Sequence, residues 1–384
     1  MSGWKTRLQV MAAVAALLAV GSPAAGRAQT TAVLGAVGVG YETYRFEDAE
    51  RIGIRSLSLL VAPVATRVPL IGASTVELGG AFAHGKLERP DGSETILVGM
   101  VDTDLRLRVP LAGGSAAIHG VVSLPTGKAT LTLEEAEIAG AIATDLFPTR
   151  ISQWGAGGGA GMGLTVVGTV GGFALGAGAS YLVAREFEPL EVDAFAYRPG
   201  NTLSLQVAAD RNIGRAGKAT LQVAMEHHEE DALNGANLYR AGRRYRVIGS
   251  YAFAAGARSS GIVYAGAQHR DRGRSAVDLL LDVPAQDLVV LGGGMRVPLG
   301  RITLTPNLDA RLLRSDDGTA QGHITTAGAA VEVPLSRSIV AVPSLRARVG
   351  NLVVREGQES AMRGLDFALT LRSPVALRSP LTSR

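Results

Sequence analysis

The feature that most constrains this chain is a long series of runs in which apolar and polar residues alternate one by one. The run 202–210, for example, places Leu203, Leu205 and Val207 on one face and serine, glutamine and aspartate on the other. Successive side chains of a β-strand point to opposite faces, so each run predicts a strand with one apolar and one polar face. Sixteen runs fit this pattern, or fourteen if two weak ones fall in loops: 32–44, 54–67, 74–88, 95–109, 115–125, 154–167, 172–186, 200–210, 218–228, 241–254, 259–271, 286–297, 301–314, 322–333, 339–353 and 363–372.

A closed barrel in lipid accommodates these strands better than a soluble β-sandwich. A sandwich would have to pair every apolar face in one core, and large sandwiches divide into domains, whereas no linker interrupts this chain. In a barrel, lipid covers the apolar face and closure satisfies the backbone hydrogen-bonding groups. Aromatic residues are only 5% of the chain, so thin aromatic girdles are expected. The sequence therefore predicts an all-β fold, a single antiparallel transmembrane β-barrel of about 14–16 strands.

A repeated four-residue phrase marks strand ends. Residues 67–70, 108–111 and 296–299 read Arg-Val-Pro-Leu, and residues 332–335 read Glu-Val-Pro-Leu. Proline lacks the N–H that a strand interior needs, so it belongs at strand ends. The four phrases end the second, fourth, twelfth and fourteenth predicted strands, so all four should lie at one end of the barrel. Short turns follow them and longer polar connections occupy the other end, which predicts that the phrases lie on the periplasmic side.

The N-terminal residues have the parts of a secretory signal peptide. Lys5 and Arg7 precede the apolar stretch 10–20, and small residues follow at 26–28. The apolar stretch is shorter than the roughly 20 residues of a membrane-spanning helix, although a retained anchor is the alternative. We expect a signal peptide at 1–28, the barrel at 29–372 and a periplasmic C-terminal tail at 373–384.

Charge and cysteine content exclude some classes of function. Three of the 38 basic residues lie in the predicted signal peptide. The remaining chain therefore has nearly as many basic as acidic residues, of which there are 34, and is almost neutral. No basic run with interleaved aromatic residues indicates nucleic-acid binding. The chain has no cysteine, so disulfide bonds do not hold this exported protein together.

Residues 131–146 carry the one strong helix signal, in the longest connection. Thr132 and the glutamate three residues later match a capping box, and acidic residues in the first turn suit the helix dipole. Pro148 is expected to end the helix. The helix either folds into or over the mouth and constricts it, or caps the rim from outside. The constriction candidates are Glu134, Glu135, Ile138, Ile142 and Leu146.

Charged residues in the predicted strands are expected to face the lumen. An arginine at the lipid midplane would cost about 2–4 kcal/mol. Inside the barrel, such charges either tune the selectivity of a pore or pair with one another and brace the interior. The pore-lining candidates are Glu77, Asp102, Asp104, Arg106, Arg108, Arg244, Arg246, Asp309, Arg311, Arg346, Arg348 and Asp366.

Signals for catalysis are weak. Residues 125–130 lack the first glycine and the final serine or threonine of a phosphate loop. His227 and His228 are neighbours on a predicted strand and point to opposite faces, so they do not form a joint metal site. A hydrolase would need His84 or His119 beside a serine or an aspartate. We expect no enzyme, no cofactor and no metal.

One short phrase resembles a known family. Leu-Pro-Thr-Gly-Lys at 124–128 ends a strand and opens the longest connection. It resembles a phrase in bacterial outer-membrane channels for hydrophobic compounds, which include fatty-acid and aromatic-hydrocarbon transporters and outer-membrane proteins of phenol degradation. The sequence patterns at 102–105, 306–311 and 343–348 are similar to those of strands in these channels. The resemblance implies a barrel that passes hydrophobic compounds. The N-terminal hatch of the fatty-acid transporters has no counterpart, because the first strand is expected near residue 32.

These patterns together predict a monomeric channel of the bacterial outer membrane. Its expected partners are outer-membrane lipid and a small solute, which is hydrophobic if the resemblance holds. The alternative is a barrel that does not conduct and serves a structural or surface-interaction role.

Overall fold

The computed structural model describes residues 34–70, 73–148, 151, 154–191, 195–214, 216–276, 282–318, 321–355 and 358–373. Sixteen antiparallel strands form a closed barrel, as predicted, with β4 and β5 forming one strand of the wall. Closure is made by β1, which pairs with both β2 and β21. The wall strands are β1 (Leu34–Phe46), β2 (Ser56–Pro69), β3 (Thr75–Glu88), β4 (Glu94–Met100), β5 (Thr103–Leu111), β6 (Ala116–Leu124), β7 (Gly159–Val170), β8 (Phe173–Ala184), β10 (Thr202–Ile213), β11 (Gly217–His228), β14 (Arg244–Ala254), β15 (Ser260–Arg270), β17 (Gln286–Leu299), β18 (Ile302–Ser315), β19 (Gln321–Pro334), β20 (Val340–Arg355) and β21 (Gln358–Arg372).

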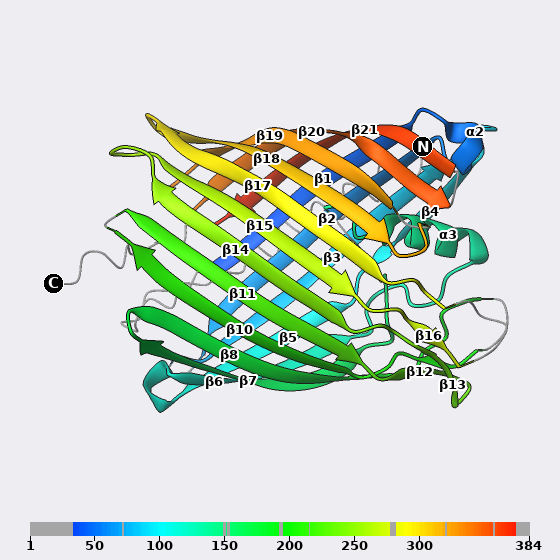
Figure 1. Cartoon of the computed structure of the whole chain (residues 1–384), viewed down its shortest axis with the longest axis horizontal. Helices are drawn as coiled ribbons and strands as arrows, with labels where there is room; N and C mark the ends of the chain where they lie inside the picture. Colours follow the sequence, from blue (N-terminus) through cyan, green and yellow to red (C-terminus); the bar gives the residue numbers. More distant parts are fainter. Residues whose placement is uncertain are drawn as a thin grey trace.

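The smaller elements, except one 3-10 turn between β5 and β6, gather at one end of the barrel (Figure 1). A separate four-stranded sheet there was not predicted from the sequence. Its hairpin turns at Asn234 and Gly235, which both have positive φ, as a tight two-residue turn requires. The small sheet consists of β9 (Tyr197–Arg198), β12 (Glu230–Leu233), β13 (Ala236–Arg240) and β16 (Arg274–Ser275), and the helices are α2 (Ala49–Ile52), α3 (Leu133–Ile142) and the 3-10 turn η1 (Ala112–Gly114).

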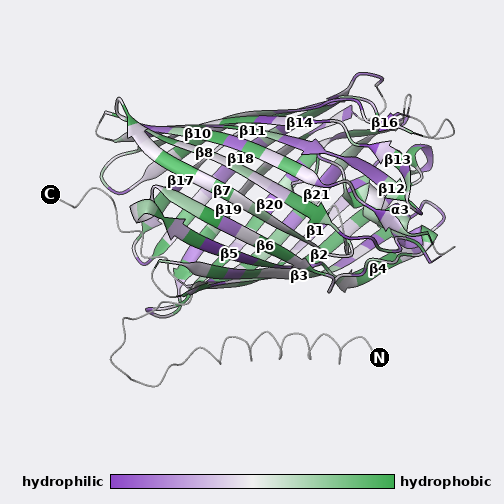
Figure 2. Cartoon of the chain, turned by 90° about the horizontal axis from the view of Figure 1, so that it is seen from below, coloured by the Kyte–Doolittle hydropathy of each residue, from purple (hydrophilic) through white to green (hydrophobic). Residues whose placement is uncertain are grey.

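The alternation of the sequence becomes the two faces of the wall, visible as alternating bands along the strands in Figure 2. On β10, Leu205 and Val207 point outward, and Val207 exposes 53% of its surface. Gln206 lies between them and points inward. The outer wall is thus a broad exposed apolar surface, which suits contact with lipid rather than water.

The two ends of the barrel differ in their connections. All four phrases with Val-Pro-Leu end their strands at the same end, as predicted, because β2, β5, β17 and β19 run in the same direction through the barrel. The chain enters and leaves the wall at this end, where the Ser373 N–H donates to the Gly35 carbonyl at 3.1 Å. We call it the turn end, and the opposite end, which carries α2, α3 and the small sheet, the loop end.

A bulge interrupts the strand formed by β4 and β5. Phe82 pairs with Met100 and Gly79 pairs with Asp104, so three residues stand opposite two. An extra residue of this kind reverses the facing of everything beyond it. Leu97 is therefore buried on the inner face, whereas Leu105 is exposed on the outer face. The single uninterrupted strand predicted at 95–109 was wrong in this respect.

The segment 155–184, which has no charged residue, forms strands in agreement with the predicted runs 154–167 and 172–186. Most of it is the hairpin of β7 and β8, which turns at Gly171 and Gly172 with φ of 56° and 81°. No described helix has the length and apolar character needed to span a membrane. The predicted signal peptide and residues 374–384 of the predicted tail lie outside the described residues.

Candidate functional site in the barrel lumen

The connection 125–158 between β6 and β7, hereafter the long loop, packs against the inner face of the wall. Ile138 and Ile142 of α3 are fully or almost fully buried. A Cβ atom at Gly85 of β3 would lie 3.0 Å from each of these two side chains. Glycine on the inner face of β3 therefore makes the space that α3 occupies. An external cap on the rim, one of the two predicted positions for the helix, is thus not the arrangement found.

The start of α3 follows the predicted capping box. The Glu135 N–H donates to the Thr132 hydroxyl, and the Thr132 N–H donates to the Glu135 carboxylate. The pKa of the Glu134 carboxyl is lowered, first by the backbone N–H at the helix start and then by the Thr132 hydroxyl. The predicted end at Pro148 was wrong, because the helix stops at Ile142 and the following turn directs the next apolar residues across the lumen.

The tip of the long loop reaches strands on other sides of the barrel. The Phe147 ring stacks on Tyr44 of β1 with centroids 4.3 Å apart. Arg311 of β18 donates to the Phe147 carbonyl at 3.3 Å, and Gln268 of β15 donates to the Asp145 carboxylate at 3.3 Å. Leu146 is fully buried. The loop therefore lies across part of the lumen.

Asp102 holds the two ends of the long loop together. Its carboxylate accepts from the Gly127 N–H at 2.9 Å and from the Ala156 N–H at 2.7 Å. A side chain at Gly127 would collide with Asp102 and with the Trp154 carbonyl. The glycine of the Leu-Pro-Thr-Gly-Lys phrase is thus needed for close packing. Lys128, which follows it, pairs with Glu135 of α3 at 2.5 Å.

A buried charge cluster lies on the inner face of β1, β20 and β21. Arg348 exposes 1% of its side chain and contacts Glu42 at 2.8 Å and Asp366 at 3.3 Å. Tyr44 donates to Glu42 at 2.9 Å and also contacts the Arg348 guanidinium. The cluster joins two predicted lumen residues to two that the sequence did not single out. Because Tyr44 also stacks on Phe147, the cluster forms part of the surface on which the long loop packs, hereafter its seat.

The inner face on the other side of the barrel is wet. Ser180 and Leu182 of β8, Gln206 of β10 and Gln222 of β11 point inward and are exposed to solvent. Ile248 of β14 also points inward and is 38% exposed. These residues lie in the middle of the wall and in its half nearer the loop end. We call this surface the wet face.

Several predicted lumen residues form ion pairs toward the turn end. Asp104 pairs with Arg106, whose side chain is 62% exposed, and Glu77 pairs with Arg67. Glu332 lies between Arg296 and Arg372, at 3.0 and 2.7 Å.

Other predicted residues lie in the lumen farther from the turn end. Arg244 and Arg246 approach Glu226 at 3.3 and 3.8 Å, and Asp309 contacts Arg311 at 3.4 Å. The structure thus brings these residues into local pairs rather than into one ring. Within the described part of the chain, the inward residues Arg108 and Arg346 have no carboxylate within ion-pair distance.

The histidines are dispersed. His119 is within hydrogen-bond distance of Thr165 at 2.9 Å, and His228 contacts Thr202 at 3.0 Å. His227 points outward and His228 inward, as their adjacent positions on β11 require. Among the described residues, no three histidine or carboxylate side chains are grouped to hold a metal ion.

Comparison with solved structures finds this fold in outer-membrane channels. OprB of Pseudomonas putida at high pH has a TM-score of 0.50 and 8% identity, over 88% of this chain and 93% of that one. The outer membrane channel DcaP of Acinetobacter baumannii has a TM-score of 0.44 and 12% identity, over 91% and 100% of the two chains. The anion-selective porin of Comamonas acidovorans has a TM-score of 0.40 and 11% identity, over 89% and 99%.

At 8% identity, the likeness to OprB shows the fold alone, and the predicted membership among hydrophobic-compound transporters is not confirmed. No protein-family profile and no curated protein matches the chain. The closed sixteen-stranded barrel and its exposed apolar outer wall indicate a protein of the bacterial outer membrane, in agreement with the predicted location.

Proposed function

We propose that the protein is an outer-membrane channel through which small hydrophilic solutes diffuse. The observation that carries the proposal is the wet face, where Ser180, Gln206 and Gln222 point inward and remain exposed. Solutes would pass between this face and the long loop, with the loop end outside the cell and the turn end in the periplasm. Amide and hydroxyl groups along the passage favour hydrophilic solutes over the hydrophobic ones that the sequence resemblance implied.

Charge in the lumen supports a weak preference for anions. Most inward arginines are neutralised by a carboxylate, but Arg108 and Arg346 have no ion-pair partner within the described residues. Unpaired positive charge along a narrow water-filled passage raises the local concentration of anions. The predicted pore-lining residues would then act through these two unpaired side chains rather than through a complete ring.

Single-channel recording in planar bilayers tests the proposal. The purified protein should give discrete conductance steps, and Ser180→Trp with Gln206→Trp should reduce them by filling the passage. Val207→Trp is the matched control, because Val207 is the neighbour of Gln206 and faces lipid. Equal conductance of the two tryptophan variants would place the passage elsewhere.

A barrel that does not conduct is the second candidate. The long loop across the lumen and the buried cluster around Arg348 favour it, because both fill interior space on one side. Absence of conductance in any salt would reject the channel and support this alternative. If the protein does conduct, liposome-swelling assays with sugars of increasing size measure the widest solute that passes.

A further inference from the structure

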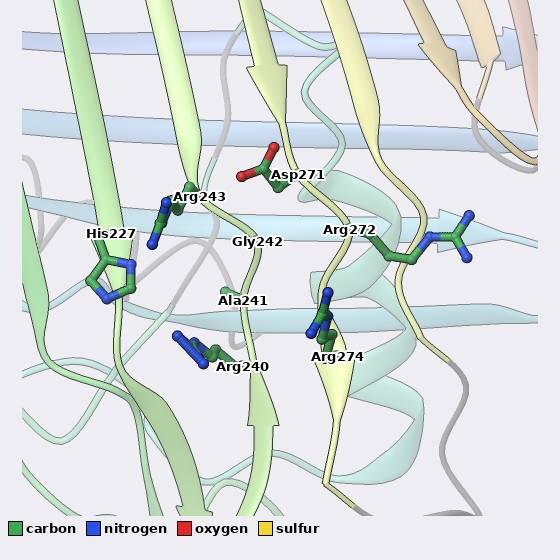
Figure 3. Close-up of a pocket in the computed structure, with 8 residues that line it drawn as sticks. All are labelled: His227, Arg240, Ala241, Gly242, Arg243, Asp271, Arg272 and Arg274. Atoms are coloured by element: carbon green, nitrogen blue, oxygen red, sulfur yellow. The ribbon is translucent and has the colours of Figure 1, made fainter.

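A basic pocket opens at the loop end of the outer wall (Figure 3). It has a volume of about 360 Å³ and is lined by Arg240, Arg243, Arg272 and Arg274, with His227 and Asp271 at its edges. In Figure 3 the strands that carry these residues lie in front of α3, which packs on the opposite side of the barrel. The pocket is therefore separate from the lumen and from the proposed channel.

The positive charge of this pocket is incompletely balanced. Arg240 and Arg274 are direct register partners on β13 and β16, and like charges directly opposite one another destabilise a sheet. Arg240 is 4.0 Å from Glu230, at the limit of an ion pair. Within the described residues, Arg243 and Arg274 have no ion-pair partner. An anion between these side chains would relieve their repulsion.

Carboxylates near the pocket are engaged elsewhere. Asp271 lies 3.2 Å from the Nε2 atom of His269, and Asp316 holds Arg272 at 2.7 Å. Arg272 accordingly points away from the other three arginines in Figure 3. The remaining three guanidinium groups provide the planar, paired donors that phosphate oxygens accept best.

The pocket lies directly beyond the apolar band of the outer wall. Toward the loop end, His227 lies two residues beyond Met225 of β11. Arg243, directly before β14, lies two residues beyond Tyr245 in the same direction. Two residues of a strand cover about 7 Å. The first outward side chains beyond the apolar band are therefore basic here, at the depth where lipid headgroups carry their phosphates.

An apolar groove leads up to the same place. It has a volume of about 480 Å³ and includes Met225 and Tyr245 at its upper end. Small outward residues, Ala177 and Ala179 of β8, leave the groove between larger neighbours on β7 and β10. A second hollow of about 570 Å³ shares Ala177 with it and extends it toward the turn end.

We propose that the groove and the basic pocket together bind one amphiphile of the outer leaflet, with an acyl chain in the groove and a phosphate headgroup between Arg240, Arg243 and Arg274. An apolar groove that ends in unbalanced guanidinium groups matches a phosphate-bearing lipid in both shape and charge. Lipid binding at this site does not depend on conduction. An experiment that refutes the lipid site therefore leaves the proposed channel untouched, and the reverse also holds.

Native mass spectrometry of the full chain in a neutral maltoside detergent tests the site with three probes. Dioleoylphosphatidic acid has both the phosphate and the acyl chains, dioleoylglycerol lacks the phosphate, and inorganic phosphate lacks the chains. We expect one tightly bound phosphatidic acid and weak binding of the other two. Inorganic phosphate that binds as tightly as phosphatidic acid would identify a site for free anions and overturn the proposal.

Substitution of the three arginines by glutamine should weaken phosphatidic acid binding. Each arginine near a membrane surface contributes roughly fivefold, so Arg240→Gln, Arg243→Gln and Arg274→Gln together should raise the Kd by about 100-fold. The matched control removes three exposed arginines of the turn end, as Arg258→Gln, Arg301→Gln and Arg337→Gln, and should bind as the unchanged protein does. Equal Kd values for the two triple variants would overturn the proposal.

Two single variants separate the groove from the pocket and guard against misfolding. Ala179→Phe fills the groove and should weaken phosphatidic acid while leaving the weak binding of inorganic phosphate unchanged. Arg274→Glu should pair with Arg240, keep the small sheet folded and still abolish tight phosphatidic acid binding. Tight binding to either variant would refute the proposed occupant.

Discussion

The Asp102 carboxylate should determine how tightly the ends of the long loop are held. It accepts hydrogen bonds from the N–H groups of Gly127 and Ala156, at 2.9 and 2.7 Å. A hydrogen bond to a charged group contributes about 1.5–3 kcal/mol. Replacing Asp102 by alanine therefore removes about 3–6 kcal/mol of stabilisation from the two loop ends.

The middle of the long loop is held independently of Asp102. Burial of an isoleucine or leucine side chain contributes about 1.5–3 kcal/mol, and Ile138, Ile142 and Leu146 are all buried against the inner wall. We therefore expect Asp102→Ala to leave α3 in place while the loop ends open more often. Mean conductance should change little, and the noise of the open-channel current should increase.

Labelling of a single cysteine measures the opening directly, because the chain has no cysteine of its own. Ala129→Cys lies beside Gly155 between the two loop ends. A loss of about 3 kcal/mol in local stability should raise its rate of reaction with a soluble maleimide on the order of 100-fold. Asp91→Ala is the control, because Asp91 accepts from the Ser93 N–H at 2.8 Å, within the turn between β3 and β4, and binds neither end of the long loop. If the cysteine of Ala129→Cys reacts at the same rate with and without Asp102→Ala, the reasoning is refuted.

Three further predictions concern the interior. Arg348→Met should lower the free energy of unfolding by about 3–5 kcal/mol in urea titrations, because it leaves two buried carboxylates without their cation, whereas Arg346→Met should cost little. Arg108→Gln with Arg346→Gln should shift the zero-current potential in a KCl gradient toward cation preference, and an unchanged potential would exclude both residues from selectivity. Gly85→Leu should cost about 1–3 kcal/mol by overpacking α3, while Gly79→Leu on the same face of β3 should not, since its Cβ meets nothing within 4 Å.

The wall of the barrel could be predicted from the sequence because a period of two is a local signal. Each of the sixteen alternating runs corresponds to a strand, and the repeated Val-Pro-Leu phrase marks the turn end correctly. The bulge at 101–103 could not be predicted in the same way. Leu97 and Leu105 are in phase in the sequence yet face opposite sides of the wall. One extra residue in a strand leaves the composition unchanged and is fixed only by pairing with β3.

The seat of the long loop depended on residues far apart in the sequence. The helix and its apolar face at Ile138 and Ile142 were predicted, but the surface that receives them was not. Gly85 and Gly322 accept the loop by having no side chain, and a glycine in an alternating run gives no sign of what packs against it. Glu42 and Tyr44 were missed because a polar inward residue is expected at every second position of such a strand.

A signal for the seat did exist, and it also bears on where a passage can lie. Strands around a water-filled lumen should place polar residues inward throughout, yet Leu57, Leu59, Leu87 and Leu97 all point inward near the loop end and are buried. The inner faces of these strand ends are apolar, which is stable only if something apolar covers them. The long loop does so, together with Ile324 of β19. Because this covered surface lies on β2, β3 and β4, solutes would be confined to the opposite side. There the inward residues of β8, β10 and β11 are small or polar, with the exception of Leu182. The same uneven distribution of inward leucines that places the loop therefore supports the wet face as the route of passage.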